Sequence, residues 1–295
     1  MRRSALPYGL KNVMLSTRRI TAFAITLMLL CLAATAAAQI WRGGFGGRTP
    51  PRFATINSFG GGFNFCRVMF TSDHREKQGW STDYPGADIN FSVRIAELTK
   101  IQVKMQDDGE GGGDPDAIVV RLTDDALFKC PFIFMEDAGT MRMRPQEAAR
   151  LQDYLLKGGF LLVSDYHGSW AREQFEEEIG KVLPPSRFPV RNLTPPNDHA
   201  MWKTMFPVSK LPQMASIATW RRTGGDIIER WNEDASPPAA YGIADEDGRL
   251  MVVMVHNTDL PDPWEREGED KGYFYQFSPD AYAVGIDILL YSMTH

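Results

Sequence analysis

Four apolar segments of this chain each run directly into a polar cluster, and this arrangement constrains the fold more than any other feature. The segments and the residues that follow them are 65–70 with Asp73 and His74, 131–135 with Glu136 and Asp137, 160–163 with Asp165 and His167, and 250–255 with His256 and Asp259. Segments with helical periodicity lie between them. Apolar strands that alternate with helices predict an α/β protein with an open, largely parallel sheet and helices on both faces.

Helix and turn signals give the expected order of the remaining elements. Helices are predicted over 88–98, from Pro145 to Gly158, after a cap at Ser169, and after a cap at Ser278 with Pro279 in the first turn. Residues 101–105 alternate between apolar and polar, as in a half-exposed strand. Residues 117–122 predict a short strand or turn, and 241–256 predict a hairpin that turns at 247–248.

The polar clusters are expected to meet at one edge of the sheet. In an open parallel sheet the carboxyl ends of the strands share an edge, and ligands bind in the crevice beyond it. The hairpin leaves the direction of the fourth strand open, so the pattern alone does not assign its cluster to this edge. The alternative interpretation of each cluster is an ordinary solvated loop.

Converging carboxylates and imidazoles could serve metal binding or acid–base chemistry. A divalent metal is one candidate cofactor, since both groups are suitable ligands, and the same pair can act as base and orienting group. No sequence motif identifies a specific catalytic or metal-binding chemistry. The chain has no His-Glu-x-x-His, no Gly-x-Ser-x-Gly turn around Ser164, and no phosphate-loop ending after the glycines at 109–113. The candidate catalytic residues are Asp83, Asp165, His167 and His199.

Aromatic residues beside carboxylates suggest a second kind of site. The stretches WSTDYPGAD and DLPDPWE suit a small-molecule, glycan or peptide ligand through stacking and hydrogen bonds, and they add Trp80, Asp83, Asp88, Trp264 and Glu265 to the binding candidates. The alternative is structural: the tryptophans fix long loops to the body of the protein, and Asp88 caps the helix that follows.

The N-terminal residues differ from the rest of the chain. Residues 1–38 combine a basic start, an apolar run and an Ala-x-Ala pattern, which predicts a secretory signal peptide or an uncleaved anchor. Residues 39–62 are rich in Gly and Pro and predict a flexible linker, and 63–295 predict a single α/β domain. The expected location is therefore the periplasm or the outer face of the membrane.

Charge and cysteine content exclude several classes of protein. Loss of residues 1–38 removes five positive charges and no negative charge, so the formal net charge moves from −5 to −10. Such an acidic domain is a poor binder of nucleic acid. Only Cys66 and Cys130 follow the signal segment, too few for a four-cysteine zinc site or a disulfide-dependent scaffold. They predict two buried thiols or, in an oxidising compartment, a single bridge.

Long stretches of the chain resemble a bacterial family known as domain of unknown function 4159. The matching stretches are FCRVMF, GWSTDYPGADINFSVRIAELTKIQV, LFKCPFIFMEDAG, LQDYLLKGGFLLVSD, NDHAMW, GRLMVVMVHNTDLPDPWE and AYAVGIDILLYSMTH. The resemblance implies a flavodoxin-like sheet similar to the class I glutamine amidotransferase fold. It also implies an exported or membrane-associated protein, and family members are often near or fused to von Willebrand A-type modules and MoxR-type ATPases.

The resemblance bears on catalysis through one turn. In amidotransferases the strand that corresponds to 160–163 leads to the nucleophilic cysteine, whereas this chain has Ser164, Asp165 and Tyr166 there. Glutamine hydrolysis is therefore not expected. The leading hypothesis is a non-catalytic binding or accessory module of the cell envelope. The alternatives are a metal-dependent hydrolase that uses the Asp and His clusters, and a structural component of an envelope complex.

Overall fold

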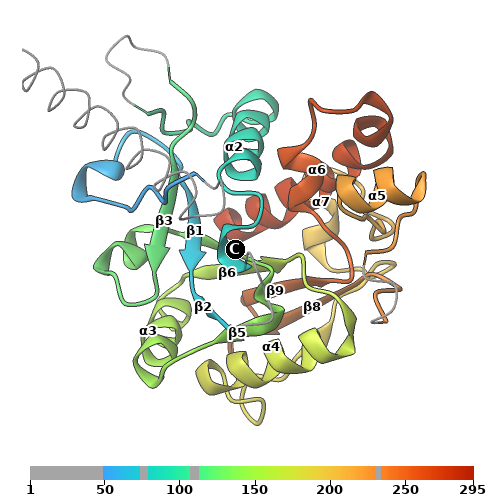
Figure 1. Cartoon of the computed structure of the whole chain (residues 1–295). Coiled ribbons are helices and arrows are strands. Elements are labelled where there is room, and N and C mark those ends of the chain that lie inside the picture. Colours follow the sequence, from blue (N-terminus) through green and yellow to red (C-terminus); the bar gives the residue numbers. More distant parts are fainter. Residues whose placement is uncertain (1–48, 74–78, 107–112, 230–233) are drawn as a thin grey trace, which may run out of the picture. The chain divides into compact units, whose positions relative to one another are not determined.

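A computed structural model describes residues 49–73, 79–106, 113–229 and 234–295 (Figure 1). The predicted signal segment and His74 lie outside the described residues. A compact unit covers Pro51–His295, so the second half of the predicted linker belongs to it: Phe53 forms a bridge with Val119, and η1 (Ile56–Ser58) is a short 3-10 helix. No helix within the described ranges is long and apolar enough to span a bilayer.

A seven-stranded sheet organises this unit, in the order β3-β1-β4-β6-β9-β8-β7. The five parallel strands are β1 (Phe65–Met69), β3 (Ala117–Arg121), β4 (Phe132–Glu136), β6 (Phe160–Ser164) and β9 (Leu250–His256). Two antiparallel strands, β8 (Ala239–Ala244) and β7 (Arg191–Asn192), complete one edge. The prediction of a largely parallel α/β sheet is therefore confirmed. The chain passes from β3 back across β1 to β4, so the strand order reverses between β1 and β4.

Helices cover both faces of the sheet (Figure 1). One face packs against α2 (Gly86–Leu98), α6 (Pro261–Glu265) and α7 (Lys271–Thr294), and the other packs against α3 (Pro145–Leu156) and α4 (Gly168–Val182). Successive side chains of each strand point to opposite faces of the sheet and so contribute to both cores. The remaining elements are β2 (Thr71–Ser72), β5 (Met141–Arg142), α5 (Ile217–Thr223), η2 (Gly79–Ser81), η3 (Asp125–Lys129), η4 (Ala138–Thr140) and η5 (Ala200–Lys203).

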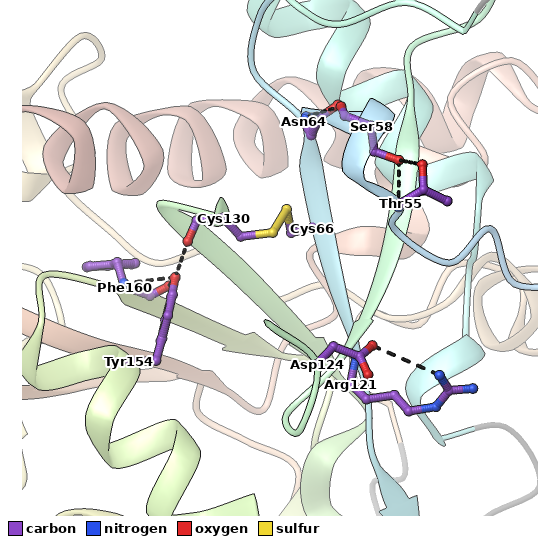
Figure 2. The surroundings of a disulfide bond; sticks show 9 residues. All are labelled: Thr55, Ser58, Asn64, Cys66, Arg121, Asp124, Cys130, Tyr154 and Phe160. Carbon is purple, nitrogen blue, oxygen red and sulfur yellow. Dashed lines mark hydrogen bonds and ion pairs between the residues drawn. A yellow bond between two sulfur atoms is a disulfide. The ribbon is translucent and has the colours of Figure 1, made fainter. Parts of the chain in front are cut away.

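A disulfide joins the two strands at the point where the order reverses (Figure 2). Cys66 lies in β1 and Cys130 lies two residues before the start of β4, with 6.2 Å between their Cα atoms and a sequence separation of 64. Beside it, the Tyr154 hydroxyl donates to the carbonyl of Cys130 at 2.8 Å and accepts from the backbone N–H of Phe160 at 3.3 Å. Of the two states predicted for these cysteines, the bridge is the one that forms.

Several predicted element boundaries are wrong. α7 begins at Lys271, because the Asp270 side chain accepts hydrogen bonds from two N–H groups of the first turn, and Pro279 lies inside the helix. Ser278 is buried and donates to the Pro263 carbonyl at 2.7 Å. His167, and not Ser169, occupies the N-cap position of α4. Residues 101–105 make only isolated bridges, since β3 and β4 already occupy both edges of β1.

A matched pair of glycine substitutions tests the packing between α7 and its neighbours. A Cβ at Gly285 would lie 2.6 Å from Trp264 and 2.7 Å from Phe91, whereas a Cβ at Gly180 in α4 would approach Pro185 no closer than 3.7 Å. Gly285→Ala should lower the free energy of unfolding by about 1–3 kcal/mol, because it overpacks the core. Gly180→Ala should raise it by up to about 1 kcal/mol, because alanine favours helix. Urea unfolding measures both, and equal effects at the two sites would contradict this packing.

Candidate functional site

A buried arginine in β1 organises the carboxyl edge of the sheet. Arg67 shares the face of Phe65 because side chains alternate, and its guanidinium is fully buried. Nε donates to both oxygens of Asp88, at 3.1 and 3.0 Å, and Nη1 donates to the carbonyls of Trp80 at 3.2 Å and Thr82 at 2.9 Å. Ion pairs with Asp88 and Glu136 complete the set. Burial alone would lower the pKa of Arg67, but the two carboxylates raise it above its ordinary value.

Six carboxyl groups from four separate segments gather at this edge of the sheet, and one of them, Glu136, pairs with Arg67. They are Asp83 before α2, Glu136 at the end of β4, Asp165 after β6, Asp259 after β9, and Asp262 and Glu265 in α6. Oxygens of Asp83, Asp262 and Glu265 all lie within 4.8 Å of one another. Glu136 lies within hydrogen-bonding reach of Asp83. We refer to these six residues as the acidic site.

Left-handed backbone turns place these groups at the ends of the strands. Asp137, Asp165 and Asn257 each directly follow a parallel strand, with φ of 51°, 55° and 60°, and Asp83 has φ of 55°. Asp and Asn tolerate this conformation better than other non-glycine residues, and such strained turns concentrate at functional sites. The chain therefore bends sharply as each strand ends, and the polar side chains stay at the edge of the sheet.

Burial and mutual repulsion disfavour the charged form of the acidic site. Burial raises the pKa of Asp83, Glu136 and Asp259 well above its usual range, and neighbouring carboxylates raise it further. Burial also raises the pKa of Asp262 to about 6, although hydrogen bonds from Tyr273 and from the N–H of Ile217 oppose the shift. A positively charged ligand would relieve this repulsion.

The two histidines near the strand ends lie in different environments. His167 is buried, and its Nε2 is 3.0 Å from Oδ1 of Asp165, so this histidine borders the acidic site. His256 faces the opposite core, where its ring packs on Tyr166 and Nε2–H donates to the Gly168 carbonyl at 2.9 Å. It lines a separate surface pocket of about 500 Å³ beneath α4.

The remaining candidates from the sequence lie away from the acidic site or in supporting positions. Asp88 pairs with Arg67 and is not a helix cap, Asp73 pairs with Arg142, and Asp137 accepts from the N–H of Gly79. Trp80 contacts Tyr84, and Trp264 lies in the core against Phe91 and Phe134. His199 caps η5 beside Tyr291. Burial lowers the pKa of His199. Trp264 is fully buried, so its ring is not accessible to a ligand.

Sequence reasoning missed Arg67 and Asp262. Arg67 lies inside a strand, and nothing local distinguishes it except that a charged residue interrupts the apolar run FCRVM. Asp262 follows Pro261 and precedes Glu265 by three positions, so the two carboxylates share one face of a helix that starts at this proline. That spacing was the available signal.

Removing the Arg67 charge should destabilise the protein strongly. Arg67→Met leaves Asp88 and Glu136 buried without a counter-ion, which should lower the free energy of unfolding by about 3–5 kcal/mol. The triple variant Arg67→Met, Asp88→Asn, Glu136→Gln should recover part of that loss, since no unpaired charge remains. Urea unfolding of the three proteins measures both effects. A single variant as stable as the wild type would contradict the role of this ion pair.

His256 should make stability depend on pH between 6.5 and 4. Burial lowers the pKa of His256 to about 4, so the unfolded chain binds this proton more readily than the folded protein does. Stability from this group is complete above pH 6.5 and falls as the pH drops, by up to about 3 kcal/mol at pH 4. His256→Gln should show a shallower decline over this range in urea unfolding. Parallel profiles for the two proteins would show that the histidine does not titrate in this way.

Comparison with known families places the whole sheet within one family. A family model described as a domain of unknown function (DUF4159) matches residues 65–293. The match starts at the first residue of β1 and ends in the last turn of α7, so it contains every residue of the acidic site. A search of curated proteins found no match.

Proposed function

The chain belongs to the DUF4159 family, and we propose that it acts as a non-catalytic, exported binding module of the cell envelope. Its ligand carries positive charge and occupies the acidic site. One observation carries this proposal: six carboxyl groups converge where, among the described residues, arginine or lysine ion pairs come only from Arg67 and Arg266, and Arg67 is already committed to Asp88 and Glu136. Uncompensated buried charge is costly to keep and is typical of functional sites.

The strand order supports a flavodoxin-like, amidotransferase-like architecture for this module. Counted along the chain, the parallel strands β1, β3, β4, β6 and β9 follow the order 2-1-3-4-5 of doubly wound flavodoxin-like sheets. In such sheets ligands bind beyond the carboxyl ends of the strands, near the point where the order reverses. Glu136 lies at that edge, on a strand beside the reversal.

The turn after β6 supports a binding role over glutamine hydrolysis. Asp165 holds the left-handed position directly after the strand, where an amidotransferase of similar fold has its cysteine nucleophile. Cys130 lies at the opposite end of β4, and its sulfur is bonded to Cys66. Neither described cysteine is therefore available as a thiolate at this turn.

Two features of the chain support the proposal that the protein is exported. Residues 1–38 have the pattern of a signal segment, and the Cys66–Cys130 disulfide is of a kind that persists in oxidising compartments. The partners that the family resemblance implies, von Willebrand A-type modules and MoxR-associated systems, belong to the same proposal.

A metal-dependent hydrolase is the second candidate function. The pair formed by Asp165 and His167, with 3.0 Å between Oδ1 and Nε2, favours it, because a carboxylate that orients an imidazole is a common acid–base arrangement. This pair borders the acidic site and could act on a ligand held there.

Thermal unfolding with a panel of cations tests the binding proposal. The panel is Ca²⁺, Mg²⁺, Mn²⁺, spermidine and arginine amide, added to the full chain. At about 100 times its dissociation constant, one of these should raise the melting temperature by about 5–10 °C. Asp259→Asn should reduce that shift, and Asp153→Asn, an exposed control on α3, should not.

Two results would contradict the proposal. No shift with any cation would show that the acidic site binds no positively charged ligand. Ammonia release from glutamine that Asp165→Asn abolishes would show an amidotransferase instead of a binding module.

A further inference from the structure

Three carboxylates of the acidic site have the spacing of ligands to a single ion. Asp262 and Glu265 are three positions apart in α6, and Asp83 reaches them from the loop before α2. Their ligand oxygens all lie within 4.8 Å of one another. Oxygens that bind a calcium ion at about 2.3–2.6 Å lie at most about 5 Å apart, so these three groups can reach one ion with little movement.

Contacts within the protein hold these carboxylates in place. Oδ2 of Asp262 accepts from the Tyr273 hydroxyl at 2.7 Å and from the N–H of Ile217 at 2.8 Å, and Oδ1 lies 4.0 Å from Nε of Arg266. Oε2 of Glu265 lies 2.7 Å from Arg266. Metal-binding carboxylates characteristically receive supporting hydrogen bonds like the two to Asp262.

A second observation is independent of the acidic spacing. Ser164 is fully buried, and its hydroxyl has no hydrogen-bond partner among the described residues. It lies opposite Glu136 in the parallel register, and both side chains point to the face covered by α2 and α6. Buried polar atoms almost always have a partner, so this hydroxyl points to a polar ligand between the strand ends and α6.

We propose that Asp83, Asp262 and Glu265 bind one hard divalent cation of the Ca²⁺, Mg²⁺ or Mn²⁺ class, and that Glu136 and Ser164 face its hydration shell. This inference rests on the proposed function and names the ligand class of the same site. The three ligands supply only carboxylate oxygens, which suit hard cations; sites for zinc and copper usually include imidazole or thiolate. An ion of charge +2 also offsets the repulsion that makes the acidic site costly.

Calorimetric titration tests the metal site directly. The full chain is stripped with chelator, dialysed, and titrated separately with CaCl₂, MgCl₂ and MnCl₂. We expect about one ion per chain for at least one metal. Asp83→Asn and Glu265→Gln should each weaken its affinity at least tenfold; asparagine tolerates the left-handed turn at position 83, and glutamine keeps the shape of Glu265.

The matched control is Glu269→Gln. It removes one negative charge from the segment just after α6, where Glu269 is partly exposed and pairs with Arg221 and Arg266, but it is not one of the three ligands. Its affinity should stay within twofold of the wild type. Circular dichroism confirms that each variant is folded. A Tb³⁺ emission signal excited through tryptophan adds a local readout, because Trp264 lies between Asp262 and Glu265 in α6.

The outcomes separate this inference from the broader proposal. No heat and no Tb³⁺ signal, together with a melting shift by spermidine or arginine amide, would overturn the metal site and leave a binding module for organic cations. Equal metal affinity in the wild type, Asp83→Asn and Glu265→Gln would place the ion elsewhere and overturn this assignment. Absence of binding by every cation would overturn both.

Discussion

The ion pairs of Arg67 are the interaction on which the carboxyl edge of the sheet depends. One guanidinium joins β1 to β4 through Glu136, to α2 through Asp88, and to the loop before α2 through two carbonyls. Arginine suits this position because its planar group presents five donors and stays charged when buried, whereas a lysine would offer three donors from a single point. The loop that carries Asp83 is therefore held in place by a contact that starts inside a strand.

The charge balance explains why the carboxyl edge of the sheet can hold both the stabilising ion pairs of Arg67 and a binding site. Arg67 compensates Asp88 and Glu136, but it cannot also compensate the other five carboxyl groups of the acidic site. Burial raises the pKa of several of them, so the protein bears an electrostatic cost there that packing elsewhere must offset. Buried carboxyl groups without a compensating charge violate the usual pairing of buried charges, and such violations occur mainly at functional sites.

Packing of α6 against α2 and α7 sets the geometry of the acidic site. α6 carries Asp262 and Glu265, and Trp264 between them packs against Phe91 and close to Gly285 of α7. A larger residue at Gly285 would displace this tryptophan and with it the two carboxylates. The disulfide acts in a similar way at the other end of the strands, where it fixes β1 to the segment that leads into β4.

The sequence by itself determined β1, β4, β6, the hairpin of β8 and β9, the main helices and the presence of polar residues at the strand ends, because each depends on residues that are close along the chain. It did not determine the start of α7 at Lys271, since the capping geometry of Asp270 decided that boundary. Only the tertiary structure decided which carboxyl groups meet: Asp83 joins Asp262 across the molecule because α2 and α6 cover the same face of the sheet. Strand alternation directs His256 to the opposite core from Val255, so a histidine at a strand end lies outside the acidic site. The order in which strands pair and the faces that helices cover are global properties, and no local pattern specifies them.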